Sequence, residues 1–174
     1  MSSLWRTCTT TGAPRLCTQH VPPPLCHSHS ASLLLRCRDF AIALHAADSL
    51  EVQQRLLGHT RPVLSVALGG CRVVSGGCDG IRIWCLPRGE CIGHMLCGGP
   101  AFALALHGAT LLSGACGETG VRVWDVHAQK LVGRLNGGSA GAIGSVCALA
   151  CDGQRAASGV NAGFVPQLWD NFFR

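Results

Sequence analysis

A pattern of three short apolar runs, the last of which ends in tryptophan, occurs three times in this chain. The copies end at Trp84, Trp124 and Trp169, so the tryptophans are 40 and 45 residues apart. In each copy the second run ends in a Ser-Gly pair, and the three serines are Ser75, Ser113 and Ser158. A period of this size is typical of repeat proteins, whose units bury their apolar faces against their neighbours. Because short apolar runs bounded by glycine-rich turns are typical of strands, the sequence predicts an all-β repeat fold.

A fainter copy precedes these three. With a shift of 39 residues, "LLLRCRDFAIALHAADSLEV" aligns without a gap with "RVVSGGCDGIRIWCLPRGEC", and His45 takes the place of Trp84. Residues 33–57 are therefore predicted to form the later strands of a first unit, which lacks its first strand and its tryptophan. The repeat region as a whole is predicted to span residues 32–174.

The charge distribution argues against two classes of partner. The formal net charge is +5, only 13% of residues are charged, and the arginines are spread along the chain. Nucleic-acid binders usually gather such charges in a stripe, so we expect no nucleic-acid partner. The longest apolar run, residues 101–112, is broken by His107 and Gly108. It is shorter than the ~20 residues that cross a bilayer, so we expect no membrane partner.

Cysteine usage and the first residues bear on the compartment. The chain has twelve cysteines, and those of the repeat region lie within apolar runs or near turns, where free cysteine packs as a small hydrophobe. The first twenty residues have no apolar core of a signal peptide. A reducing compartment, the cytoplasm or the nucleus, is therefore expected. Residues 1–31, rich in Thr, Pro, Ser and His, are predicted to be a disordered or low-complexity segment.

The period, the Gly58-His59 pair, and Trp-Asp at Trp124-Asp125 and Trp169-Asp170 resemble WD40 repeats. The resemblance covers roughly residues 33–174 and implies a β-propeller of four-stranded blades. The predicted strands amount to three of a first blade, two full blades and three of a fourth. The fold class expected is therefore an incomplete WD40 β-propeller of about 3–4 four-stranded blades.

The resemblance also implies a buried structural hydrogen-bond network in each repeat. Its residues in the second unit are His59, Ser75, Asp79 and Trp84. The third unit keeps Ser113 and Trp124 but has Gly98-Gly99 near the histidine position, and the fourth keeps Ser158 and Trp169. A serine, a histidine and an aspartate also make up a catalytic triad, but here the tryptophan partner is expected to bury the serine. We therefore predict that these residues have no catalytic role and that the protein is not an enzyme.

Other candidate sites are weaker. The residues Cys8, Cys17, Cys26, His20, His27 and His29 lack the close cysteine pairs of zinc sites, so no metal is expected. The glycine-rich stretches lack the Gly-Lys-Ser/Thr ending of phosphate loops, so no cofactor is expected. Arg82 and Arg122 hold the same place in their tryptophan strands, where alternation with apolar residues predicts a solvent-facing position.

The function expected is a non-catalytic protein-interaction scaffold with a protein or peptide partner. Arg61, in the loop after Gly58-His59, is predicted to lie on the face where the WD40 family often binds peptides. The compact turns also resemble WD40 domains of F-box-linked ubiquitin-ligase substrate receptors, which suggests a fragment of such a receptor. Three alternatives stay open: a truncated or non-functional fragment, self-association that completes the ring, and an enzyme on a propeller scaffold.

Overall fold

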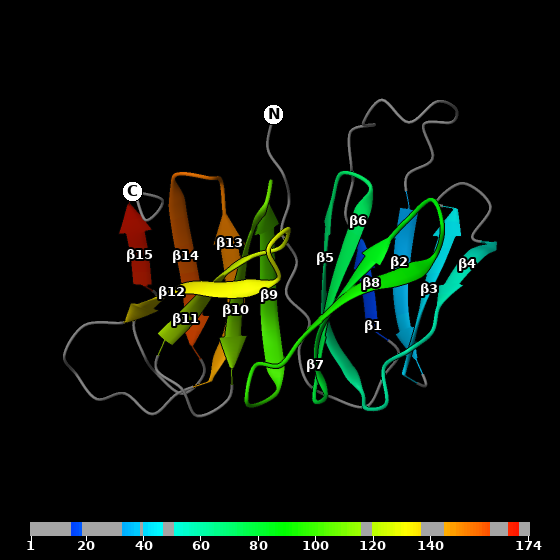
Figure 1. Ribbon diagram of the computed structural model, residues 1–174, viewed down its shortest axis with the longest axis horizontal. Coiled ribbons are helices and arrows are strands. Elements are labelled where there is room, and N and C mark those ends of the chain that lie inside the picture. Colours follow the sequence, from blue (N-terminus) through cyan, green and yellow to red (C-terminus); the bar gives the residue numbers. More distant parts are fainter. Residues whose placement is uncertain are drawn as a thin grey trace.

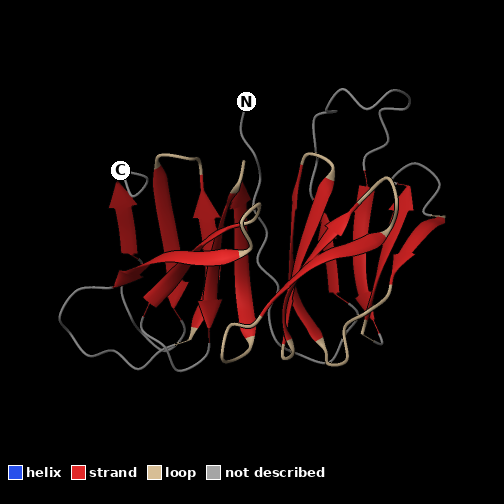
Figure 2. Ribbon diagram, in the orientation of Figure 1, coloured by secondary structure: helices blue, strands red, loops and turns tan. Residues whose placement is uncertain are grey.

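The computed structural model describes residues 15–18, 33–38, 40–46, 51–115, 120–136, 145–160 and 167–170. All the regular structure in these residues is β-strand, as Figure 2 shows. The strands form four antiparallel sheets that lie side by side (Figure 1). In these parts of the chain, no helix is long and apolar enough to cross a membrane.

Each sheet is called a blade here, and strand order in each blade follows chain order. Blade 1 contains β1 (Arg15–Thr18), β2 (Leu33–Arg38), β3 (Ala41–Ala46) and β4 (Val52–Leu56). Blade 2 contains β5 (Val63–Gly69), β6 (Arg72–Gly77), β7 (Gly80–Cys85) and β8 (Glu90–Met95). Blade 3 contains β9 (Ala101–His107), β10 (Thr110–Ala115), β11 (Gly120–Asp125) and β12 (Lys130–Asn136). Blade 4 contains β13 (Val146–Cys151), β14 (Arg155–Val160) and β15 (Gln167–Asp170).

The prediction that blade 1 lacks its first strand was wrong. Strand β1 pairs antiparallel with β2, from Arg15 opposite Cys37 to Thr18 opposite Leu34. It lies inside the segment predicted to be disordered or of low complexity; the rest of residues 1–31 lies outside the described residues. Four residues are too few to show an alternating pattern, and the strand is defined by its pairing with β2.

Blade 4 has three strands among the described residues, whereas blades 1, 2 and 3 have four each. An incomplete all-β propeller is therefore confirmed, with three full blades and one partial blade. The first strands of neighbouring blades contact one another, β5 with β9 and β9 with β13. In a propeller these are the strands nearest the axis.

The blades pack face to face through three apolar clusters, and each cluster takes a tryptophan from the later blade. Trp84 packs between blades 1 and 2, Trp124 between blades 2 and 3, and Trp169 at the margin of the cluster between blades 3 and 4. The Trp84 side chain is fully buried and that of Trp124 is 5% exposed. Both faces of blades 2 and 3 are thus covered, so alternation along these strands separates two apolar junctions rather than core from solvent.

Two glutamines join the outer strand of one blade to the turn that precedes the outer strand of the next. The amide of Gln54 on β4, oriented to satisfy both groups, donates to the carbonyl of Leu86 at 3.0 Å and accepts from the N–H of Gly89 at 3.1 Å. Gln129, in the turn after β11, donates to the carbonyl of Ile92 on β8 at 3.0 Å. Each bond links the turn of one blade to the outer strand of the blade before it.

Candidate functional site

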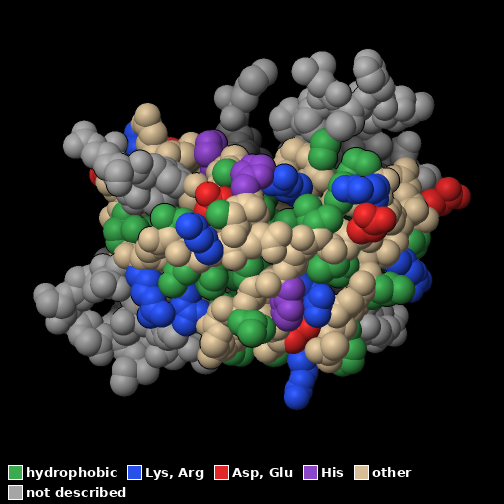
Figure 3. All heavy atoms as spheres, in the orientation of Figure 1, with side chains coloured by type: hydrophobic (Ala, Val, Ile, Leu, Met, Phe, Trp, Pro, Cys, Tyr) green, Lys and Arg blue, Asp and Glu red, His purple; other side chains and the backbone are tan. Residues whose placement is uncertain are grey.

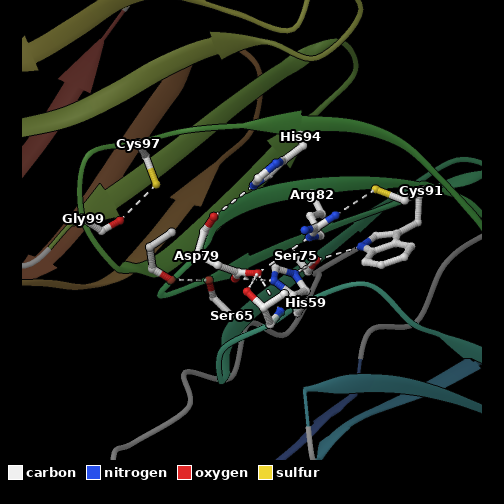
Figure 4. Close-up of polar contacts among 12 residues, drawn as sticks. His59, Ser65, Ser75, Asp79, Arg82, Cys91, His94, Cys97 and Gly99 are labelled. Atoms are coloured by element: carbon white, nitrogen blue, oxygen red, sulfur yellow. Dashed lines mark hydrogen bonds and ion pairs between the residues drawn. The ribbon is translucent and has the colours of Figure 1, made fainter.

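His59, in the loop between β4 and β5, is at the centre of a buried hydrogen-bonded chain (Figure 4). Its Nδ1 lies 2.6 Å from Oδ1 of Asp79, and its Nε2 lies 2.6 Å from Oγ of Ser75. The indole N–H of Trp84 donates to the same serine oxygen at 2.8 Å. The backbone N–H of Thr60 donates to Oδ2 of Asp79 at 2.8 Å. The structure thus brings together all four residues of the predicted network and ties the loop to β6, to the turn before β7, and to β7.

The hydrogen-bond pattern accommodates a neutral His59, the state that its lowered pKa favours. Because the Trp84 N–H occupies one lone pair of the Ser75 oxygen, the serine proton is available to Nε2 of His59. Nδ1 is then the N–H that donates to Asp79, and His59 is neutral. Burial lowers the pKa of His59 below 6.5, although the hydrogen bond to Asp79 and its charge act in the opposite direction. Burial acts to raise the pKa of Asp79, but hydrogen bonds from Thr60 and His59 outweigh it and hold that pKa below 3.8.

This geometry stabilises a loop rather than exposing a nucleophile. The Ser75 side chain is 0% exposed, and its oxygen already accepts from Trp84. An acyl or phosphoryl substrate would need to reach that oxygen. In this conformation the Ser75 oxygen is closed to such a substrate.

Among the described residues, blade 3 keeps the Trp-Ser pair of the network, and an arginine anchors its loop. Trp124 donates to the Ser113 oxygen at 2.8 Å, as in blade 2. Where blade 2 has its Gly-His pair, blade 3 has two glycines, and the Arg122 guanidinium donates from Nη1 to the carbonyl of Cys97. Arg122 is 6% exposed. The Arg122 side chain therefore ties the loop before β9 to β11.

The prediction that Arg82 and Arg122 face solvent was wrong. Each precedes its tryptophan by two residues and so lies on the same face of the strand, which is covered by the preceding blade. Nε of Arg82 lies 3.8 Å from Oδ2 of Asp79, and its Nη1 donates to the Cys91 sulfur at 3.7 Å. The spacing of two residues from tryptophan is the sequence signal that could have shown this burial.

Blade 4 departs furthest from the pattern. Ser158 is buried and Trp169 is half-buried, but within the described part of the chain no hydrogen bond joins them. The aspartates that follow the tryptophans also differ. Asp125 accepts from the backbone N–H groups of His127 and Ala128, at 2.8 and 2.9 Å, which fixes the turn after β11. Asp170 lies 3.8 Å from Nε of Arg155 in an exposed ion pair, which contributes little stability.

Exposed side chains surround the loop that contains His59, at the end of blades 1 and 2 where β4 and β8 end. The group called the loop-end surface here consists of Leu57, Thr60, Arg61, His94 and Leu96. Leu57 and Leu96 directly follow β4 and β8 and are 69% and 76% exposed. Asp79 contacts two of these members: it accepts from Thr60 through its carboxylate, and Nε2 of His94 lies 2.9 Å from its carbonyl oxygen.

Outside the loop-end surface, the charged side chains are dispersed. On the face seen in Figure 3, Lys and Arg side chains lie in several separate places between apolar side chains. Among the described residues, no three His, Cys, Asp or Glu side chains lie close enough together to hold a metal ion. Of the residues considered above as zinc ligands, Cys17 lies on β1, and the other five lie outside the described residues.

No protein-family profile and no curated protein matches this chain. Two computationally designed proteins of β-propeller-like fold are similar to it in structure. The crystal structure of the Ika4 protein matches with a TM-score of 0.67 and 20% identity, over 79% of this chain and 84% of that chain. The crystal structure of the Ika8 protein matches with a TM-score of 0.68 and 21% identity, over 82% of this chain and 44% of that chain. The chain thus spans less than half the length of Ika8, and its class is an all-β, β-propeller-like protein.

Proposed function

We propose that the chain is an arc of WD40-type repeats and acts as a non-catalytic scaffold that binds a protein or peptide on the loop-end surface. The observation that carries this proposal is the network around His59, which fixes a loop whose next side chains point to solvent. The Trp-Ser pairs of blades 2 and 3 and the period of the repeats support the WD40 assignment. A rigid framework that presents exposed loops is the usual basis of binding in such folds, and it needs no cofactor.

The side chains of the loop-end surface define the chemistry of the partner. Leu57 and Leu96 offer apolar contacts, and Arg61 is an exposed cation. The carboxylate of the network, on Asp79, is 11% exposed and its oxygens accept from His59 and Thr60. A segment with apolar and acidic side chains therefore complements this surface.

A photo-crosslinking amino acid at position 61 tests this proposal. Arg88, exposed in the turn at the opposite end of blade 2, is the matched control position. We expect crosslinking to a discrete partner from position 61 and not from position 88. The purified partner should then bind Arg61→Glu at least ten-fold more weakly than the wild-type protein, and Arg88→Glu with unchanged affinity. Equal affinities for both variants and the wild-type protein would exclude the loop-end surface as the binding site.

A finer hypothesis assigns the chain to a ubiquitin-ligase substrate receptor in the cytoplasm or nucleus. Seven cysteines of the described residues, from Cys71 to Cys151, are free, which supports a reducing compartment. The hypothesis predicts that the partner crosslinked at position 61 carries ubiquitin when proteasomes are inhibited, and that Arg61→Glu removes the modification. A partner without ubiquitin under these conditions would exclude the ligase assignment and leave the scaffold proposal standing.

A further inference from the structure

One row of side chains crosses each blade on the face that points to the following blade. In blade 2, Ala67 lies opposite Val74, which lies opposite Ile83. The same strand register places a corresponding row in each later blade. These rows are Ala105, Leu112 and Val123 in blade 3, and Ala150, Ala157 and Leu168 in blade 4. We call each of these sets the forward row of its blade.

Burial of the forward row changes abruptly at blade 4. The forward rows of blades 2 and 3 are buried, with no side chain above 8% exposure. They pack against the face of the next blade that carries Trp124 or Trp169. In blade 4, Ala150 and Ala157 are half-buried and Leu168 is 63% exposed, whereas its counterparts Ile83 and Val123 are 1% and 8% exposed.

The occupant that fits a forward row is the opposite face of another blade, because this chain makes that junction between blades 2 and 3 and again between blades 3 and 4. Blade 1 presents such a face at the other end of the arc. On β3, Ala43 and His45 hold the places of Arg82 and Trp84, and both are half-buried rather than buried. The arc therefore ends in two faces of complementary kind.

We propose that two copies of the chain close one ring, with the forward row of blade 4 in each copy packed against blade 1 of the other. A two-fold axis forms both junctions at once and leaves neither terminal face exposed. The comparisons support the geometry. The arc covers 84% of Ika4 and 44% of Ika8 with nearly equal TM-scores, so an arc of this curvature also forms part of a chain about twice as long. This association uses blade faces, so it is independent of the loop-end surface.

The test is light scattering after size-exclusion chromatography of the full 174-residue chain over a range of concentrations. We expect a mass about two-fold that of one chain, falling toward the single-chain mass on dilution, because Ala157 buries less apolar area than its counterparts Val74 and Leu112. Leu168→Asp and Ala43→Asp should each give the single-chain mass with unchanged circular dichroism. Val132 is 65% exposed on β12, the outer strand of blade 3, so the control Val132→Asp should keep the two-fold mass.

Mixing the two variants makes the test specific for the proposed pairing. A Leu168→Asp copy keeps an intact blade 1, and an Ala43→Asp copy keeps an intact forward row, so the mixture can form one wild-type junction. Recovery of the two-fold mass in the mixture would support the proposal. A wild-type protein that stays single-chain at all concentrations would overturn it. An Ala43→Asp variant that dimerises alone would also overturn it, because two blade 4 faces would then pair with each other. Open filaments instead of a closed pair would overturn it as well.

Discussion

Gly93 on β8 leaves the space that the side chain of Gln129 occupies. A Cβ at position 93 would lie 2.7 Å from the Gln129 carboxamide, which donates to the neighbouring carbonyl of Ile92. At the preceding junction the two residue types are exchanged. There Gln54 is on the outer strand and Gly89 is in the turn, and a Cβ at Gly89 would overlap the Gln54 amide. These two junctions therefore each pair one glutamine with one glycine, at a contact between an outer strand and the turn of the next blade.

Substitution of Gly93 by alanine should cost about 1 kcal/mol of unfolding free energy. The obstructing atoms end a flexible side chain, so Gln129 can move away, and the loss is then its hydrogen bond to Ile92. In a Gln129→Gly background the cost should disappear, which a double-mutant cycle by urea unfolding would measure. At Gly133, the equivalent position in blade 3, an added methyl group would meet no atom within 4 Å, so Gly133→Ala is the control and should cost nothing. Equal costs in both backgrounds would contradict the pairing.

Removal of the repeat serines should destabilise the blades in a fixed order. Ser75→Ala leaves two buried groups without a partner, the Trp84 N–H and Nε2 of His59, whereas among the described residues Ser113→Ala leaves only the Trp124 N–H. Each unsatisfied group costs about 1–3 kcal/mol, so Ser75→Ala should cost roughly twice as much as Ser113→Ala.

Ser158→Ala completes this series. Among the described residues Ser158 makes no bond to Trp169, so its removal should change stability by less than about 0.5 kcal/mol. Tryptophan fluorescence during urea unfolding measures all three variants. A Ser158→Ala cost equal to that of Ser75→Ala would show that the three blades do not differ in the way the structure indicates.

Stability should fall as the pH is lowered below 6.5. The folded pKa of His59 lies below this value because of burial, so the unfolded chain binds more protons between pH 6.5 and the folded pKa. Unfolding is therefore favoured as the pH falls through this window, by up to about 1.4 kcal/mol per pH unit for one proton. The lowered pKa of Asp79 acts in the same direction below pH 3.8.

Urea unfolding at several pH values from 5 to 7.5 measures this slope. His59→Gln should remove much of it, since the neutral side chain does not titrate. His94→Gln, which changes an exposed histidine beside the same aspartate, should retain it. A slope unchanged by His59→Gln would show that His59 is not the group responsible.

The repeat pattern predicted most of this fold but not the first strand. The three copies of the pattern, which end at Trp84, Trp124 and Trp169, each form strands of one blade. Short alternating runs between tight turns have few other stable arrangements. Strand β1 could not be predicted, because its four residues lie in a stretch rich in Thr, Pro and His and have no periodicity of their own. Its pairing with β2 is a long-range contact, which local sequence does not encode.

The site, like the fold, could be predicted only in part. The contacts among His59, Ser75 and Asp79 could be anticipated only through the resemblance to a repeat family, because residues 16 to 20 positions apart have no local signal for contact. The burial of Arg122 was missed because alternation in a strand was interpreted as core and solvent. In blade 3 both faces meet another blade, so the alternating arginine lies within a junction instead.

Cys85, which is half-buried, should react faster with alkylating reagents than the buried Cys151. A hydrogen bond from Arg88 lowers the pKa of Cys85 below 9.0, whereas burial raises the pKa of Cys151 to about 11. Because the thiolate is the reactive form, iodoacetamide at pH 7.5 should alkylate Cys85 at least ten-fold faster than Cys151, as followed by peptide mass spectrometry. Arg88→Ala should slow the reaction of Cys85, whereas the control Arg155→Ala should leave it unchanged. If Cys85 reacts at the same rate in both variants, its reactivity depends on exposure alone and not on the neighbouring guanidinium.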